Sequence, residues 1–315
     1  MDNRNGYAKT DSAIVMNHYQ EYAEFLKKFV SVASPIRVVF DSSDGATGPV
    51  LHELFTTHQL INSILINSKP NGEFPAHGPN PLARGAQKDL RIVVKKNNAD
   101  LGVIFDADGD RVFFIDNEGR EIRSDIAALL MSEVFQGPFV FDIRAGYALR
   151  DRLDETKKKA IYSRVGHVFM KRAMREHGAE FGGELSGHFY FKDFFFADSG
   201  IVAALTMIRI VSQLVQNESS LAARLDSIPA TYYSGEVSIT VSRNDSAIER
   251  VVSAFQAVAE HVDHTDGVRI DAKDFWISVR ASNTEPVIRF VLEAREKSVF
   301  NRELKKLKEA IGTAN

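Results

Sequence analysis

The sequence predicts an α/β protein made of three small mixed α/β domains. Strand-like apolar runs alternate with helical segments over residues 19–228, and short polar or glycine-rich turns separate them, as in α/β units. From Pro229 onward the pattern changes to strands of alternating polarity and two amphipathic segments. A length of 315 residues suits two or three domains. We therefore expect domains at residues 1–123, 124–228 and 229–315.

The first expected domain begins with a helix from Tyr19, which ends before Pro35. The segment Lys69–Pro81 is rich in Pro, Gly and Asn and predicts an irregular surface loop. Around this loop the apolar pattern predicts strands at 36–40, 101–105 and 112–116, and helices after Gly48 and at 90–96.

The second and third expected domains follow the same reasoning, and no internal sequence repeat is evident. The second should contain helices at 124–135, 149–159, 167–176 and 200–213, strands at 138–143 and 160–165, and a strand–loop–strand unit at 180–191. The third should contain strands at 237–241, 275–280 and 287–294, and helices at 248–262 and 302–311.

Composition excludes several classes of protein. The formal net charge is −3 with both signs spread along the chain, which argues against a basic nucleic-acid binder or an acidic tail protein. No apolar run approaches the roughly 20 residues that a membrane span needs, and the first ten residues lack an apolar signal-peptide core. Cysteine is absent, which excludes disulfides, thiolate chemistry and Cys-ligated zinc or iron–sulfur centres. We expect a cytoplasmic protein whose metal ligands, if any, are oxygen or imidazole.

The aspartate loop, Asp106-Ala107-Asp108-Gly109-Asp110-Arg111, lies between two apolar strands. Alternate residues of an extended strand stand roughly 6.6 Å apart, too far to hold one small cation, so the segment must curl, and Gly109 permits this. Three converging carboxylates repel one another unless a hard divalent ion neutralises them. Mg²⁺ suits the site best, because three carboxylates leave room for water or a phosphoryl oxygen.

Two alternatives to a magnesium site were weighed for the aspartate loop. An EF-hand is rejected, because Arg111 and Asn117 stand where that loop needs Gly and Glu. A solvated acidic hairpin turn remains open, although a cation at Arg111 beside three acids suits a phosphate-bearing ligand.

The sugar loop, Gly182-Gly183-Glu184-Leu185-Ser186-Gly187-His188, follows a strand and is flanked by aromatic residues. Its glycines let the backbone approach a ligand closely, and Glu184 and Ser186 fall on one side of an extended loop, where they can hold adjacent sugar hydroxyls. His188 can add a hydrogen bond or shuttle a proton near neutral pH. A glycine-rich turn with a capping Glu is the open alternative.

The phosphate loop, Arg280-Ala281-Ser282-Asn283-Thr284-Glu285-Pro286, joins two strands, and Arg289 lies just beyond it. Ile288, Phe290 and Leu292 alternate toward a core, which turns Arg289 to the opposite face. Two guanidinium groups, two hydroxyls, an amide and a run of backbone N–H groups are what a phosphate dianion needs. A polar hairpin turn with surface arginines is the open alternative.

Taken together, FDADGDR, GGELSGH and RASNTEPVIR occur in the order and at about the spacing typical of the α-D-phosphohexomutase superfamily, which the chain resembles. The closest similarity is to its bacterial phosphomannomutase/phosphoglucomutase branch. Further similarity lies in VVFDSSDGATG, NGEFPAHGPNP and Val165-Gly166-His167, so the resemblance runs from about Tyr19 to the C-terminus.

This resemblance implies four domains around a cleft, and this sequence would contain the second, third and fourth of them. The second would hold Mg²⁺ at Asp106, Asp108 and Asp110, with Arg111 facing the substrate. The third and fourth would bind a glucose or mannose 1- or 6-phosphate, or the hexose bisphosphate, without nucleic-acid or membrane partners. The residues implied for this binding are Glu184, Ser186, His188, His167, Arg144, Arg280, Ser282, Asn283, Thr284 and Arg289.

The family activity is phosphoryl transfer between C1 and C6 of the sugar through a phosphoserine, but no nucleophilic serine can be nominated here. The family's serine loop has no counterpart in these residues, which contain no Ser-His dipeptide. Two departures lie at expected substrate contacts: Arg144 stands where relatives commonly carry Lys, and Val165 where Thr is usual.

Three functions stay open at this point. The first is an isomerase of carbohydrate metabolism that is incomplete without a serine domain, supplied in cis or in trans. The second is a catalytically silent, Mg-dependent sugar-phosphate binding protein. The third, more remote, is a metal phosphatase that uses the aspartate loop itself as nucleophile.

Overall fold

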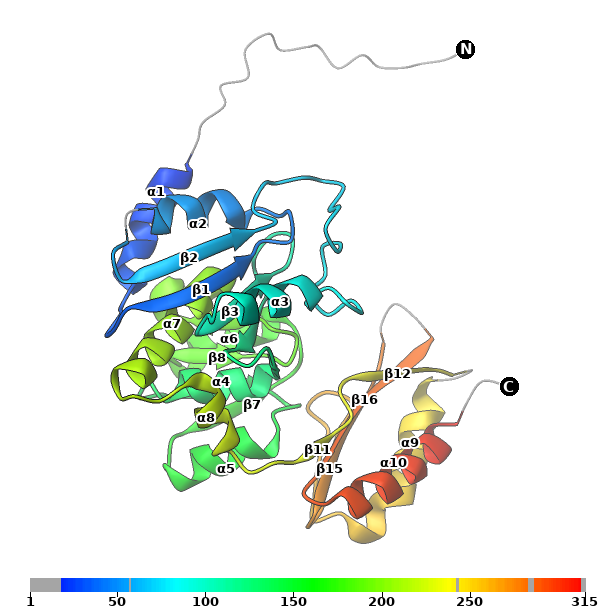
Figure 1. Ribbon diagram of the computed structural model, residues 1–315. Helices are drawn as coiled ribbons and strands as arrows, with labels where there is room; N and C mark the ends of the chain where they lie inside the picture. The colour runs from blue at the N-terminus through cyan, green and yellow to red at the C-terminus, as the bar shows by residue number, and fades with distance from the viewer. Residues whose placement is uncertain (1–17, 57, 242–243, 283–285, 313–315) are drawn as a thin grey trace, which may run out of the picture.

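The computed structural model describes residues 18–56, 58–241, 244–282 and 286–312. Its first domain is a five-stranded sheet of order β2-β1-β3-β4-β5, in which β1 runs parallel to both β2 and β3 while β4 and β5 are antiparallel additions (Figure 1). The strands are β1 (Ile36–Asp41), β2 (Ile61–Ile66), β3 (Leu101–Phe105), β4 (Val112–Asp116) and β5 (Glu121–Ile122). The helices are α1 (Tyr19–Leu26), η1 (Lys27–Phe29), α2 (Thr47–Phe55) and α3 (Lys88–Lys96).

Helices cover both faces of this sheet, which is why its strands are apolar at successive positions. Every residue of β3 and β4 is buried. Val103 and Phe105 share a core with α1 and α2 on one face, whereas Ile104 packs with Leu90 and Val94 of α3 on the other. Because the strands are packed on both faces, they hold the polar loops that follow them in fixed positions.

The second domain repeats the topology of the first, although the sequence gives no sign of it. Its sheet has the order β7-β6-β8-β9-β10, with β6 parallel to β7 and β8, and with β9 and β10 antiparallel. The β8–β9 turn therefore occupies the same place as the β3–β4 turn, and these two turns are the sugar loop and the aspartate loop. The elements are α4 (Ser124–Ser132), β6 (Phe139–Asp142), α5 (Tyr147–Glu155), β7 (Ala160–Ser163), α6 (His167–His177), β8 (Phe181–Gly183), β9 (Phe189–Phe191), η2 (Lys192–Phe194), β10 (Ala197–Asp198), α7 (Gly200–Gln216) and α8 (Leu221–Asp226).

Helix α7 joins these two domains into one body. Residues Gly200–Leu205 of this helix are all buried, and the helix contacts β1, β3 and β4 of the first sheet as well as α4 of the second domain. Apolar residues of both domains accordingly form a single core cluster. The aspartate and sugar loops are thus mounted on one rigid unit.

The C-terminal domain has its own apolar core, formed between one antiparallel sheet and two helices. The sheet has the order β11-β16-β15-β14-β13, and β12 also pairs with β16. The segment expected as one helix at 248–262 is instead a helix, a short 3₁₀ turn and a strand, because His261–Asp263 pairs with β14. The elements are β11 (Tyr232–Tyr233), β12 (Val237–Thr240), α9 (Asn244–Phe255), η3 (Gln256–Val258), β13 (His261–Asp263), β14 (Val268–Asp271), β15 (Phe275–Ala281), β16 (Val287–Ala294) and α10 (Lys297–Ile311).

Buried polar contacts fix this domain against the second one. Glu293 Oε2 accepts a hydrogen bond from the Tyr147 backbone N–H at 2.8 Å, and Arg269 donates to the carbonyl oxygens of Ile143 and Ala145 at 2.7 and 3.0 Å. Within the described part of the chain, no helix has the length and apolar character to cross a membrane.

Candidate functional site

The aspartate loop and the sugar loop touch each other across the domain boundary. The backbone N–H of Val112 donates to the Gly187 carbonyl at 3.1 Å, and Arg111 and His188 form an isolated β-bridge. Gly187 has φ +90°, and a Cβ atom there would lie 2.7 Å from Cζ of Phe113. Only glycine fits this position without displacing a buried ring, which explains why the sugar loop needs it.

The aspartate loop curls so that its three carboxylates converge. Asp106, Asp108 and Asp110 each offer an oxygen, and these oxygens lie within 4.8 Å of one another. Asp106 Oδ1 accepts the backbone N–H groups of Gly109 and Arg111 at 3.1 Å each, while Arg111 Nε donates to Asp106 Oδ2 at 2.6 Å. A cluster of oxygen ligands of this kind can hold a hard divalent cation.

The three carboxylates differ in exposure, and Asp106 and Asp110 also differ in acidity. Asp106 is buried, Asp108 is exposed and Asp110 lies between them. Burial raises the pKa of Asp106 to about 6 despite the attraction of Arg111, whereas a hydrogen bond from His188 lowers the pKa of Asp110. Asp106 therefore gains more from a nearby cation than Asp110 does, because its ionised form is the more costly of the two.

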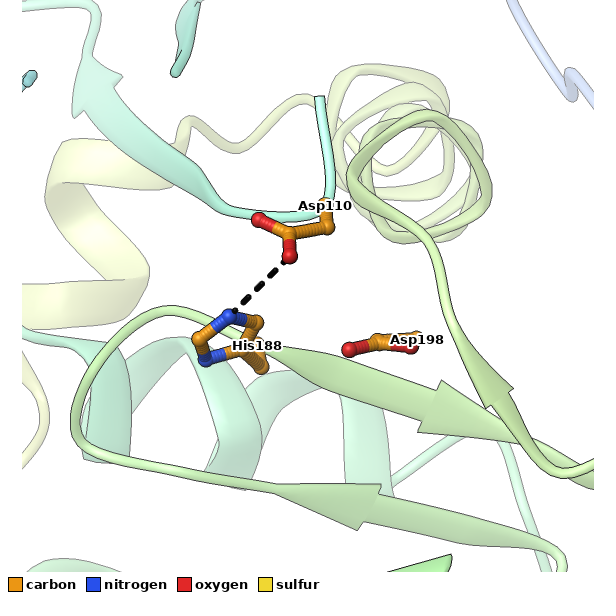
Figure 2. A group of neighbouring side chains, drawn as sticks. All are labelled: Asp110, His188 and Asp198. Carbon is orange, nitrogen blue, oxygen red and sulfur yellow. Dashed lines mark ion pairs between the residues drawn. The ribbon is translucent and has the colours of Figure 1, made fainter. Parts of the chain in front are cut away.

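His188 connects the two loops, because its ring reaches from the sugar loop to Asp110 of the aspartate loop (Figure 2). Nε2 faces Asp110 Oδ2 at 3.4 Å, and Nδ1 is 2.8 Å from Ser186 Oγ. Asp198 lies beside this pair and is bound by Lys171 at 2.7 Å. Burial would lower the pKa of His188, but the hydrogen bond and charge of Asp110 raise it above its usual value, which favours a proton on this ring.

Glu184 and His167 are placed differently from the rest of the predicted site. Glu184 is buried, and its carboxylate accepts hydrogen bonds from the Gly166 backbone N–H at 2.7 Å and the Tyr190 hydroxyl at 2.6 Å. Burial raises its pKa, with a further contribution from Asp142. His167 is exposed at the start of α6. Glu184 therefore braces the sugar loop. Neither Glu184 nor His167 lines the cavity described next, and the same holds for the predicted contacts His188 and Ser282.

A cavity of about 380 Å³ brings the loops of all three domains together. The predicted residues that line it are Arg111, Ser186, Arg144, Arg280 and Arg289. Leu82, Phe113, Glu121, Ile122, Arg123, Ser124, Val165, Leu185, Tyr233, Gly235 and Glu236 complete the wall. A larger cavity of about 880 Å³ lies by α4, α5 and Arg295, but it contains no residue of the three loops.

The phosphate loop contributes two facing arginines to this cavity. Arg280 and Arg289 are directly paired across β15 and β16. The buried Nε–H of Arg280 has no hydrogen-bond acceptor among the described residues, so it remains available to a ligand. Ser282 is half-buried and its backbone N–H donates to the Val287 carbonyl at 2.9 Å. The predicted contacts Asn283 and Thr284 lie outside the described residues.

Two acidic residues of the site escaped the sequence analysis. Asp142 pairs with the buried Arg144 at 2.8 Å, and its Oδ2 accepts the Leu185 backbone N–H at 2.7 Å. Glu236, between β11 and β12, contacts Arg144 and lies 3.3 Å from Arg280 Nη2. Asp142 could have been found from its position at the end of a buried strand, two residues before Arg144, but nothing local distinguishes Glu236 from other surface acids.

Family models match three consecutive segments of the chain. The chain matches the family models for phosphoglucomutase/phosphomannomutase α/β/α domain II at residues 20–119, α/β/α domain III at 124–232 and the C-terminal domain at 236–310. It is 34% identical over 305 residues to a phosphomannomutase of Methanocaldococcus jannaschii, covering 94% of this chain and 66% of that protein. It is 32% identical over 289 residues to a phosphomannomutase of Escherichia coli, covering 88% of this chain and 63% of that protein. The chain thus spans a little under two thirds of the length of these curated relatives.

Solved structures have the same fold. A phosphoglucomutase/phosphomannomutase family protein from Burkholderia thailandensis superposes with a TM-score of 0.82 at 25% identity, over 95% of this chain and 66% of that one. An Aspergillus fumigatus N-acetylphosphoglucosamine mutase, solved with GlcNAc-6P and magnesium, gives a TM-score of 0.66 at 14% identity, over 94% of this chain and 70% of that one. With all three of its domains matched in order, the chain belongs to the phosphoglucomutase/phosphomannomutase family.

Proposed function

We propose that this chain binds a glucose or mannose phosphate in the 380 Å³ cavity and forms the metal- and sugar-binding part of a phosphohexomutase. The observation that carries the proposal is the composition of the cavity wall, where Arg111, Ser186, Arg280 and Arg289 meet from three domains. Its volume falls in the range of small-molecule sites. Relatives named phosphomannomutase support the choice of reaction.

In this proposal the arginines of the C-terminal domain bind the phosphate that is not being transferred. Guanidinium groups suit this role because their planar donors match phosphate oxygens. Ser186 binds a sugar hydroxyl, and His188, which is hydrogen-bonded to it, can give or take a proton there. Glu184 would join the sugar contacts only after its bonds to Gly166 and Tyr190 rearrange.

Mg²⁺ is the proposed metal, held by Asp106, Asp108 and Asp110. The donor set fits it, because all three ligands are carboxylates, and the fold is shared with a mutase solved with magnesium. When bound, the ion neutralises charge on the transferring phosphoryl group. Arg111, whose Nε is 2.6 Å from Asp106, extends the positive region from the metal toward the cavity.

The serine that exchanges the phosphoryl group is proposed to come from a further domain, in the same polypeptide or in another. By itself, the 315-residue chain is expected to bind sugar phosphate and to show little or no mutase turnover. The cytoplasmic location predicted from the sequence stays a prediction.

Calorimetric titration of the purified chain with glucose 1-phosphate and mannose 1-phosphate, with and without Mg²⁺, tests the binding step. Arg280→Ala should weaken binding by on the order of 1.5–3 kcal/mol, the contribution of a charged hydrogen bond. Arg302→Ala, which removes a side chain 66% exposed on α10, is the matched control and should bind like the parent. Equal binding by all three proteins would refute the proposed site.

A turnover assay separates the mutase from a silent binding protein. The chain is incubated with Mg²⁺, glucose 1-phosphate and glucose 1,6-bisphosphate, alone and with a serine-bearing domain of a relative. Glucose 6-phosphate formed only in the presence of that domain supports the mutase. Robust turnover by the chain alone would contradict the need for a separate serine, and binding without turnover in either case would favour the silent binding protein.

A further inference from the structure

Glu236 lies among three arginines at the mouth of the phosphate loop. Its carboxylate forms a hydrogen-bonded ion pair with Nη1 of Arg144, lies 3.3 Å from Nη2 of Arg280 and 3.8 Å from Nη1 of Arg289. All four side chains line the same cavity. A carboxylate thus lies among the arginines, two of which are proposed above to bind the phosphate of the sugar.

The charges around Glu236 explain why it is held there. Arg280 and Arg289 face each other across two antiparallel strands, an arrangement in which like charges repel. Their shared contact with Glu236 offsets that repulsion. Burial opposes ionisation, but Arg144 and Arg280 hold the pKa of Glu236 below its usual value, so the carboxylate is charged at neutral pH.

A phosphate dianion cannot simply join this cluster. Among the residues that the structure describes, the three guanidinium groups face two carboxylates, since Asp142 also pairs with Arg144, which leaves one net positive charge. If a dianion bound beside Glu236, the net charge of the site would change from +1 to −1. If Glu236 moves away, the site has a net charge of +2, which matches the two negative charges of the phosphate. The Nε–H of Arg280, which has no acceptor in the part of the chain that the structure describes, is a donor that this arrangement leaves unused.

We propose that Glu236 is an internal anion of the phosphate site, which aligns Arg280 and Arg289 in the ligand-free chain and must be displaced by the phosphate of the incoming ester. This inference rests on the proposed function and adds a positioning residue to it. Glu236 has room to leave, because its side chain is 29% exposed and a Cβ atom on the preceding Gly235 would meet no other atom within 4 Å.

Displacement of Glu236 would also change the contacts between two domains. Arg144 belongs to the second domain, whereas Glu236, Arg280 and Arg289 belong to the C-terminal domain. The Glu236–Arg144 pair is therefore one of the contacts that join the two domains. An ester that takes the place of Glu236 exchanges a contact within the protein for a contact through the ligand.

The test is the affinity of the full chain for inorganic phosphate and for glucose 1-phosphate, measured by calorimetry in the parent, Glu236→Gln and Glu236→Ser. Both variants should bind both ligands at least about fivefold more tightly, because the ligand no longer has to break the ion pairs of Glu236 with the arginines. One pair of opposite charges about 4 Å apart is worth about 1 kcal/mol even in bulk water, which corresponds to about fivefold in affinity. Glu309→Gln, on the exposed face of α10, is the matched control and should leave both affinities unchanged. Tighter binding by the variants would show that Glu236 competes with the ligand. If Glu236 only supported the structure of the site, its loss would weaken ligand binding.

Each outcome decides the inference. If the parent binds and both variants bind equally or more weakly, Glu236 is not a competing anion, while the proposed function stands. If the parent shows no binding and the variants do, the inference is supported in a stronger form. If none of the proteins binds either ligand, the inference and the proposed function both fail.

Discussion

Gly187→Ala tests whether the sugar loop must pass so close to the aspartate loop. The new Cβ would lie 2.7, 3.0 and 3.2 Å from three ring atoms of Phe113, a residue that is only 3% exposed and belongs to the core beneath α3. A positive φ costs a non-glycine residue about 1–2 kcal/mol, and an extra methyl group in a packed core adds about 1–3 kcal/mol. The expected loss in the free energy of unfolding is therefore about 2–5 kcal/mol.

Gly178→Ala is the matched control, since Gly178 also has a positive φ, +61°, but no atom lies within 4 Å of its added Cβ. It should lose only the conformational part, about 1–2 kcal/mol. Urea unfolding followed by circular dichroism gives both values. Only Gly187→Ala should also weaken Mg²⁺ and glucose 1-phosphate binding, because the Val112–Gly187 hydrogen bond joins the two loops. Equal losses of stability in the two variants would refute the reasoning.

Three further predictions concern the charged groups of the site. Asp108→Ala should abolish measurable Mg²⁺ binding in calorimetry while phosphate affinity is reduced but still measurable, and unchanged metal binding would contradict the assignment. Mg²⁺ affinity should decrease as the pH falls through about 6, where Asp106 takes up a proton, and should level off above that value; a flat profile would exclude Asp106 as a ligand. Asp142→Asn should lower the free energy of unfolding by on the order of 3 kcal/mol, because Arg144 stays buried without its main counter-charge and the bond to the Leu185 N–H weakens, and thermal denaturation measures this loss.

The sequence was informative wherever function depends on local spacing. The curl of the aspartate loop could be predicted because an extended strand cannot bring Asp106 and Asp110 onto one ion, and the structure brings their oxygens within 4.8 Å. The outward face of Arg289 followed from the alternation of Ile288 and Phe290, and Arg289 does line the cavity while those two residues are buried. The domain boundaries near residues 123 and 228 stay predictions.

Contacts between segments that are far apart in the chain could not be predicted from the sequence. No local pattern reveals that α7 packs on the sheet of the preceding domain, because its N-terminal part, Gly200–Leu205, is apolar on every side and would fit any deeply buried place. The common topology of the first two domains was hidden for a similar reason, since it resides in strand order rather than in shared residues. Glu236 is 44 residues from Arg280 in the chain, and the pairing of both β11 and β12 with β16 brings it to the phosphate loop.

The distance between bound metal and bound phosphate tests most directly whether one cavity serves both. Mn²⁺ replaces Mg²⁺ in the full chain, and the ³¹P resonance of glucose 1-phosphate is followed as the paramagnetic ion is added. Broadening greater than that of the ester with Mn²⁺ alone is predicted for the parent and for Arg302→Ala. This excess should be lost in Asp108→Ala and reduced in Arg280→Ala. A sharp ³¹P signal while calorimetry reports both ligands bound would mean that the aspartate loop and the phosphate loop serve separate sites.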